Sequence, residues 1–478
     1  MNSIRRIHSD SGLILLLLLV LLTRLPLLGP GYGSDPDAWR VAFVSQRLWE
    51  TGEYSVSRFP GYPLHEILSA PLVAAGGAPA SNVGSLLAFC CAVVLWRLWC
   101  VQHTSHAVIL TAAFAFAPIA WVNSAATMDY VWSLLFLIAA MLAASRSGFI
   151  IAGIMMGIAA GFRPSNAILI IVPLLLIPNS GAERVRGIRR IIAGAIITGI
   201  LAFVPVLTRY GLGGWVSLVM DQVGGINVPP GERVLLWGYR SMYAIGPLVT
   251  IAFVVIVTTR HRHILDRVKN GDRPLLASLA GIAVLMAMFF ALPAERGYLI
   301  PAIPFALIVL DRVIQHRGLV IVTALLLSYA AVNPDVVVHG GKRGVPGFNI
   351  REGLVLEDMK KKEAVQRKRS FLSTEPFPDS TVVIVGFASQ IWVDNPHFEI
   401  DTGVLSDLHS EKERRDWAHI VARRKDKTAF LVSSVLTAEQ IRYVRDSGFS
   451  LACTDDVLEY AAFVGSFRPD EVAVLETP

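Results

Sequence analysis

The stretch LILLLLLVLL (13–22), followed shortly by GSDPDAWR (33–40), decides how this chain folds. An uncharged apolar run of this kind is most stable inside a bilayer, and the two carboxylates Asp35 and Asp37 then come out at its surface. Placing acidic side chains beside a bilayer costs free energy, so their presence indicates a function. A carboxylate is suited to taking a proton from a hydroxyl. The pattern predicts a membrane-spanning first helix whose exit carries a candidate functional acid pair.

The composition predicts a membrane protein with a water-soluble end. Of 478 residues, 54% are hydrophobic and 17% are charged, and the mean hydropathy is +0.54. Residues 1–333 carry 24 Lys and Arg against 14 Asp and Glu, whereas residues 334–478 carry 19 against 23. We expect an α-helical polytopic membrane domain over 1–333 and an exported α/β domain over 334–478. Most of the basic excess lies in short loops between spans, so it indicates orientation in the membrane and no nucleic-acid partner.

Apolar stretches long enough to cross the bilayer, or nearly so, recur along the first domain. Several are short, so half-helices or tilted hairpins are expected among them. The segment 63–78 is apolar but short and is not counted as a span. The eleven expected spans are 11–30, 82–101, 106–123, 129–145, 148–162, 164–179, 189–208, 238–259, 274–292, 297–311 and 317–333.

Loop charge predicts the orientation of these spans. With eleven spans and Arg5 and Arg6 on the cytoplasmic side, the cytoplasmic loops collect the basic clusters at 184–190 and 260–273. A full span at 63–78 would invert every later loop, so we expect a cytoplasmic N-terminus and a non-cytoplasmic C-terminal domain. The outer face then gathers a set of charged side chains: Asp35, Asp37, Arg58, His65, Glu66, Asp129, Arg163, Glu295 and Arg296.

The candidate catalytic acids each have a simpler structural explanation. Asp35 precedes Pro36, so its role could be no more than that of a helix N-cap. This explanation fits Asp37 less well. Asp129 follows Thr127 and Met128 at the start of an expected span, and it could likewise cap that helix. Capping does not exclude catalysis, and all three acids are candidate catalytic residues.

The candidate phosphate-binding residues are arginines of the same face. Arg58 either contacts phosphate or pairs with Glu53. Arg163 precedes Pro164, which should break the helix there, and it either contacts phosphate or reaches the headgroups. Arg296 lies between two spans, where a bidentate guanidinium suits a lipid-linked phosphate.

One adjacent pair suggests a metal. His65 and Glu66 follow the PGYP turn (60–63) and could bind a divalent ion. A single pair is weak evidence, so no cofactor is certain.

These motifs together resemble the GT-C class of integral-membrane glycosyltransferases, in particular its protein O-mannosyltransferase-like members. The resemblance covers roughly residues 11–312, and the tail is unmatched. It rests on SDPDAWR, the PGYPL return, TMDY, GFRPSNAILI and ERGYLIPAIP, in that order. The chain departs from the commonest pattern because Pro36 separates its two acids.

The resemblance implies transfer of a sugar from a polyprenyl-phosphate carrier to an acceptor glycan, lipid or protein on the non-cytoplasmic side. It implies Asp35 or Asp37 as the general base, Asp129 as the second-loop acid, and Arg296, with Arg163, at the donor phosphate. Two other functions stay open: a polysaccharide polymerase or ligase, and a transporter or flippase for a lipid-linked saccharide. No nucleotide-binding glycine motif occurs in the chain.

The C-terminal region shows an α/β pattern. TVVIVGF (381–387) and TAFLVSS (428–434) are buried-strand candidates, and 410–424 and 437–448 are expected helices. Residues 340–349 are an expected loop near the membrane, and the run KKKEAVQRKR (360–369) is an expected solvated helix face. We expect a partly parallel sheet with no catalytic constellation.

Overall fold

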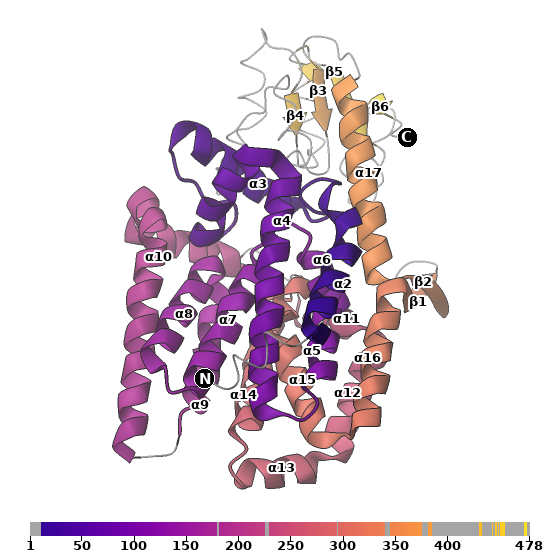
Figure 1. Cartoon of the computed structure of the whole chain (residues 1–478). Helices are drawn as coiled ribbons and strands as arrows, with labels where there is room; N and C mark the ends of the chain where they lie inside the picture. Colours follow the sequence, from indigo (N-terminus) through magenta and orange to yellow (C-terminus); the bar gives the residue numbers. More distant parts are fainter. Residues whose placement is uncertain are drawn as a thin grey trace.

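The computed structural model is a mainly helical structure with a small sheet at one end (Figure 1). It describes residues 11–178, 181–224, 229–293, 295–339 and 345–374. Beyond residue 374 it describes the four strands β3 to β6 and a few single residues near 442–448. The helix expected at 410–424 and most of the one expected at 437–448 lie outside the described residues. Of the loop expected at 340–349, residues 340–344 also lie outside them, whereas residues 345–349 belong to a strand, so the loop prediction is wrong there.

The helical elements follow the expected apolar stretches, and several of these stretches are broken. In chain order the helices are α2 (Ser11–Leu28), α3 (Pro36–Thr51), α4 (Pro63–His103), α5 (Ala107–Ala115), α6 (Pro118–Asn123), α7 (Tyr130–Ser145), α8 (Phe149–Phe162), η1 (Pro164–Ile170), α9 (Ile171–Leu175), α10 (Gly181–Gly224), α11 (Pro230–Ile245), α12 (Pro247–Thr259), α13 (His261–Lys269), α14 (Arg273–Ala291), η2 (Arg296–Leu299), α15 (Ala302–Val313), α16 (His316–Ala331) and α17 (Leu354–Thr374).

Breaks at proline and glycine change the expected spans. The stretch 63–78, which was not counted as a span, is continuous with the next one in α4 across a bend at Gly76–Gly77. The expected span 106–123 is divided into α5 and α6 before Pro118, and 238–259 is divided at Gly246, where α11 and α12 meet at 101°. By length and composition, four described helices could each cross a bilayer, or five if that bent pair is one span. The count of eleven stays a prediction.

The loops gather at two opposite ends of the helix bundle. At one end, Thr104 donates to Asp311 at 2.6 Å, and Arg312 donates to the His103 carbonyl at 2.9 Å and to Asp272 at 3.1 Å. Helix α13, with its basic residues, lies at this end (Figure 1). The other end carries α3 and the acidic loops described below. The basic loops and the candidate site are therefore separated by the length of the bundle, as the loop charges predicted.

The chain beyond α16 begins with an antiparallel hairpin. Strand β1 (Val332–His339) pairs with β2 (Val345–Glu352), and α17 follows and packs on α6 and α16. A separate sheet has the order β4-β3-β5-β6, formed by β3 (Thr381–Ile384), β4 (Phe430–Val432), β5 (Ser450–Thr454) and β6 (Ala473–Leu475). All of its strand pairs are parallel. The two strands expected at 381–387 and 428–434 are present as β3 and β4, and they pair with each other.

One residue of α17 departs from the prediction of a solvated face at 360–369. Most of the run is exposed where its side chains are described, as expected, but the side chain of Lys362 is buried. Its ammonium donates to the carbonyls of Leu27 at 3.1 Å and Ala125 at 2.8 Å. The charge is tolerated there because main-chain oxygens of the helical bundle take the place of water. The first helix after the expected domain boundary is thus attached to the membrane domain.

Candidate active site

The loop between α2 and α3 is built to hold the acid pair in place. Gly31 has φ +72°, and a Cβ there would lie 2.5 Å from the Trp39 ring, so only glycine fits. The buried Trp39 indole donates to the Gly33 carbonyl at 2.8 Å. Asn82 of α4 donates to the carbonyls of Leu28 and Gly31, at 2.9 Å each. These contacts fix the backbone immediately before Asp35.

Asp35 uses one carboxylate oxygen to cap α3 and keeps the other available for a ligand. One of its carboxylate oxygens accepts from the Asp37 backbone N–H at 2.8 Å, so the capping prediction is confirmed. Its other oxygen makes no hydrogen bond to the residues that the structure describes. Asp37, by contrast, is paired on both oxygens, with Arg40 at 2.9 Å and with Arg58 at 3.2 Å.

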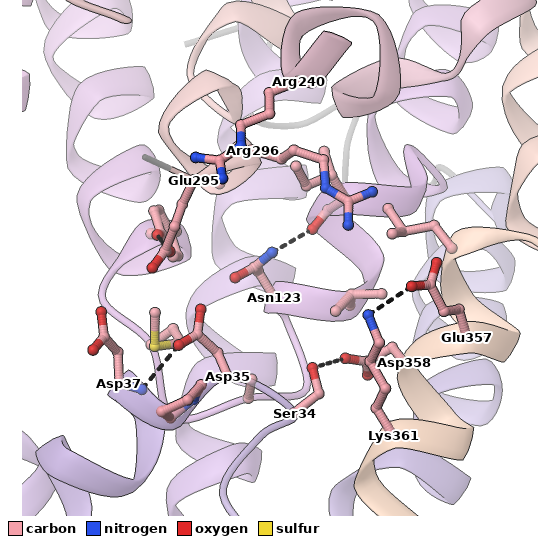
Figure 2. A pocket seen from close by; sticks show the side chains of 18 of the residues that line it. Ser34, Asp35, Asp37, Asn123, Arg240, Glu295, Arg296, Glu357, Asp358 and Lys361 are labelled. Carbon is pink, nitrogen blue, oxygen red and sulfur yellow. Dashed lines mark hydrogen bonds and ion pairs between the residues drawn. The ribbon is translucent and has the colours of Figure 1, made fainter. Parts of the chain in front are cut away.

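Both acids line a cavity of about 550 Å³ at this end of the bundle (Figure 2). Glu295 and Arg296, from the loop before α15, line it too. The remaining lining residues come from the loop before α3, from α3, α6, the loop after α6, the start of α7, α11, η2 and α17. They are Ser34, Pro36, Arg40, Ile119, Val122, Asn123, Ala126, Met128, Tyr130, Arg240, Gly297, Leu354, Glu357, Asp358 and Lys361.

The cavity has an acidic wall and a basic wall. Asp35, Asp37 and Glu295 each place a carboxylate oxygen within 4.8 Å of the other two. Arg240 and Arg296 lie together on the side of Glu295 away from the Asp pair (Figure 2). Such a cavity can bind an anionic group at one wall and deprotonate a neutral hydroxyl at the other.

The acidic wall affects the pKa of the Asp35 carboxyl. Burial raises the pKa of the Asp35 carboxyl well above its usual range, and the charges of Glu295 and Asp37 raise it further. The Asp37 N–H and Arg58 oppose this shift without cancelling it. A carboxylate of raised pKa is a stronger base than an ordinary aspartate, provided that it is ionised.

Asp129 lies in a different environment from the Asp pair. Its side chain is fully buried and makes no capping hydrogen bond, so the capping explanation is wrong. Arg58 binds one of its oxygens at 2.5 Å, and Arg163 binds the other at 2.6 Å. Both oxygens of this buried carboxylate are therefore paired with guanidiniums.

Arg58 and Arg163 are thereby occupied by carboxylates. Arg58 bridges Asp129 and Asp37, and it does not contact Glu53, which pairs with Arg47 at 3.7 Å. Arg163 does not reach the headgroups: it is 2% exposed, and its guanidinium lies 4.1 Å from the Tyr130 ring centroid. The helix break predicted at Arg163–Pro164 is confirmed, since Arg163 is extended. Neither arginine lines the cavity.

His65 and Glu66 do not form an open metal pair. Glu66 is fully buried and accepts from Ser57 N at 2.7 Å, from Ser57 Oγ at 2.6 Å and from Tyr54. The His65 Nδ1 atom is buried and has no partner among the described residues. Since Glu66 is saturated by donors that pin the loop 54–62, a cation would have to displace them.

Three features of the site were missed from the sequence. Arg240 lies in a helix that looked like one ordinary span, Glu295 was seen only as an outer charge, and α17 was assigned to a separate domain. Of these, Glu295 is part of the motif ERGYLIPAIP, so that motif could have indicated its role. Its Gly297 packs against Tyr130, where a Cβ would lie 2.5 Å from the ring, and the Tyr130 hydroxyl donates to Glu295 at 2.6 Å.

Comparison with known proteins supports the fold. No protein-family model and no curated protein sequence match the chain. Among solved structures, the crystal structure of ArnT from Cupriavidus metallidurans bound to undecaprenyl phosphate is similar, with a TM-score of 0.50 and 13% identity. The match covers 96% of this chain and 89% of ArnT. At this identity the likeness concerns the fold alone, and the chain shares with ArnT the fold of a mainly helical, integral membrane protein.

Proposed function

We propose that the chain is an integral-membrane glycosyltransferase that moves a sugar from a polyprenyl-phosphate carrier to an acceptor hydroxyl on the non-cytoplasmic side. One observation carries this proposal: a carboxylate with an unoccupied oxygen and two guanidiniums line the same cavity at one end of a GT-C-type fold. Those are the groups that glycosyl transfer from a phosphate requires. The finer resemblance to protein O-mannosyltransferase-like members, and with it the identity of the sugar, belongs to this proposal too.

Asp35 is the general base of the proposal. The acceptor oxygen attacks the anomeric carbon, its proton passes to Asp35, and the bond from that carbon to the phosphate oxygen breaks. Asp35 is favoured over Asp37 because its second oxygen is available, whereas Arg40 and Arg58 hold both oxygens of Asp37. Its raised pKa strengthens it as a base.

Arg296 and Arg240 bind the donor phosphate in this proposal. Both line the cavity, and a guanidinium stabilises the charge that develops on a departing phosphate. ArnT was crystallised with undecaprenyl phosphate, which supports a carrier of this chemical class here.

Arg58, Arg163 and Asp129 form a buried positioning unit rather than a phosphate site. The unit ties the loops at 58, 129 and 163 together, and through Arg58 it orients Asp37 beside Asp35. This assignment replaces the phosphate contacts expected for Arg58 and Arg163, because Asp129 and Asp37 together already pair with both arginines.

A divalent cation fits the acidic wall better than His65 and Glu66. Three carboxylate oxygens within 4.8 Å of one another are hard ligands of the type that Mg²⁺ and Mn²⁺ accept. A cation there would neutralise the wall and help to bind the donor. Metal dependence is tested by removing metal with EDTA: a loss of transfer that Mg²⁺ or Mn²⁺ restores would assign a cation to the site.

The test of function uses the purified full chain in nanodiscs and radiolabelled polyprenyl-phosphate sugars. Wild type should release polyprenyl phosphate and label an acceptor, and Asp35→Asn should lower the transfer rate by about 10² to 10⁴ while donor binding persists. Arg296→Ala should instead weaken donor binding. Asp266→Asn, the same change at the opposite end of the bundle, is the matched control.

The same assay separates the competing functions. A transporter or flippase moves the intact donor across liposomes and releases no polyprenyl phosphate. A polymerase or ligase transfers preassembled chains in preference to single sugars. An Asp35→Asn variant that keeps the wild-type rate would contradict the proposed base.

A further inference from the structure

A second cavity of about 450 Å³ adjoins the first. The two cavities share Arg296 and Glu357, which therefore stand at their boundary. The other residues lining the second cavity belong to α11, to the start of β1 and to β2: Tyr239, Tyr243, Asn333, Ile350, Arg351 and Glu352. The catalytic cavity thus continues into a chamber between α11 and the β-hairpin.

Asn333 supplies a hydrogen-bond acceptor that has no partner. It is 6% exposed, and its side-chain oxygen has no hydrogen-bond partner among the residues that the structure describes. A buried polar atom without a partner is unfavourable, because it has lost its hydrogen bonds to water. Asn333 lines the second cavity, and a turn of its side chain would present this acceptor to a ligand that brings a donor, such as a hydroxyl.

The remaining polar groups of the chamber suit a molecule with many hydroxyls. Glu352 and Glu357 are further acceptors, and Arg296 and Arg351 are donors. A hydroxyl both donates and accepts, so adjacent hydroxyls can use both kinds of group. An isoprenoid tail in the same place would desolvate these charges without compensation.

Two tyrosines add an apolar surface to this polar chamber. The rings of Tyr239 and Tyr243 lie 4.4 Å apart. Tyr243 is held in place because its carbonyl accepts from the Tyr329 hydroxyl at 2.8 Å. Aromatic faces next to a few convergent polar groups are typical of small-ligand sites, and the C–H face of a sugar ring packs on such a surface.

We propose that the second cavity binds the second sugar residue of the acceptor, so that the acceptor is an oligosaccharide chain. This inference rests on the proposed function, since the reacting hydroxyl must lie near Asp35 in the first cavity. Arg296 and Glu357 then contact the link between the two sugars. The hairpin and α17 thereby select the acceptor by its length.

A binding experiment without donor tests the site separately from catalysis. The full chain in nanodiscs is titrated with methyl glucoside, galactoside and mannoside, and with the matching methyl disaccharides, by ligand-observed NMR. For at least one sugar, the disaccharide should bind about tenfold more tightly than the monosaccharide, which corresponds to about 1.4 kcal/mol. Asn333→Leu and Tyr239→Ala should reduce the disaccharide to the monosaccharide affinity.

Two controls guard against misfolding. Asn333→Asp keeps acceptor oxygens at the same place and should retain the preference, whereas Asn270→Leu repeats the apolar change at the far end of the bundle and should have no effect. Equal binding of mono- and disaccharides by wild type overturns the proposal, and so does a preference that survives Asn333→Leu. If the preference is present but no polyprenyl phosphate is released from the donor, the proposed function fails while the saccharide site stands.

Discussion

Asp35 performs two tasks with one side chain. One oxygen caps α3 and so fixes the position of the carboxylate, which lines the cavity with Glu295, while the other accepts no hydrogen bond from the described part of the chain. Its neighbour Asp37 has no free oxygen, because two arginines hold it. Residues two apart thus have different chemistry, which depends on their partners rather than on their type.

The influence of Glu295 on Asp35 predicts a pH effect. Burial and then the Glu295 charge raise the Asp35 pKa, and a base works only when it is ionised, so activity should rise with pH through that pKa. Glu295→Gln removes one of the negative charges, so the acid limb of the kcat/KM profile should move to lower pH. The profiles of wild type and variant are measured at the same fixed concentration of divalent cation, with Glu183→Gln as the control. An unchanged acid limb would show that another group controls it.

Asp129 predicts a stability effect. Asp129→Asn leaves the buried guanidiniums of Arg58 and Arg163 without their shared counter-charge. Breaking a buried ion pair from one side costs about 3–5 kcal/mol. We expect that loss in the free energy of unfolding, measured by SDS titration with tryptophan fluorescence. Glu53→Gln, which removes an exposed acid, should change it by less than about 0.5 kcal/mol, and equal effects of both changes would argue against a buried ionic unit.

At the level of elements, α17 joins the C-terminal part of the chain to the active site. Lys362 anchors it to the main chain of α2 and of the loop at Ala125. One turn earlier, Asp358 accepts a hydrogen bond from Ser34, the residue before Asp35 (Figure 2). A helix that follows the membrane spans in sequence therefore supports the catalytic loop directly.

Lys362→Met tests this attachment. Methionine keeps an unbranched apolar chain but removes the charged donor and its two hydrogen bonds, each worth about 1.5–3 kcal/mol when a charge is involved. Backbone amides of α17 should exchange with deuterium faster, and the transfer rate should fall with them. Lys360→Met changes an exposed side chain on the same helix and should do neither. Unaltered exchange in Lys362→Met would mean that apolar packing alone holds α17.

At the scale of the whole molecule, polar chemistry is divided between the two ends of the bundle. At one end, hydrogen bonds link Thr104 to Asp311 and Arg312 to Asp272. The other end holds the two cavities. The apolar helices between them keep these ends apart, as a bilayer requires. The candidate site thus lies at one end of the bundle, where the proposed function requires it to meet a lipid-linked donor.

The orientation is a testable prediction, because basic loops favour the cytoplasm. Alkaline phosphatase fused after Pro478 should be active, and an epitope inserted after Gly271 should resist protease added outside intact spheroplasts. A green fluorescent protein fused after Pro478 should stay dark. A fluorescent C-terminal fusion with an externally cleaved loop epitope would reverse the orientation and move the site to the cytoplasmic face.

The sequence by itself determined which stretches are apolar, the break at Arg163–Pro164 and the acid pair that follows the first apolar run, but not the breaks before Pro118 and at Gly246. Apolar runs, Pro164 and Gly76–Gly77 act locally, so their consequences for α2, α8 and α4 follow from a few neighbouring residues. The acid pair after the first span was found in the same way, because its position next to an uncharged run is itself local.

Only the tertiary structure decided which charges neutralise one another. Asp129 meets Arg58 and Arg163 across 71 and 34 residues of sequence, and Lys362 meets Leu27 across 335. An arginine has the same chemistry whether a carboxylate or a donor phosphate faces it, so pattern alone assigned Arg58 and Arg163 to phosphate. The field at a buried group depends on neighbours within a few ångströms, and those neighbours are known only when the chain is folded.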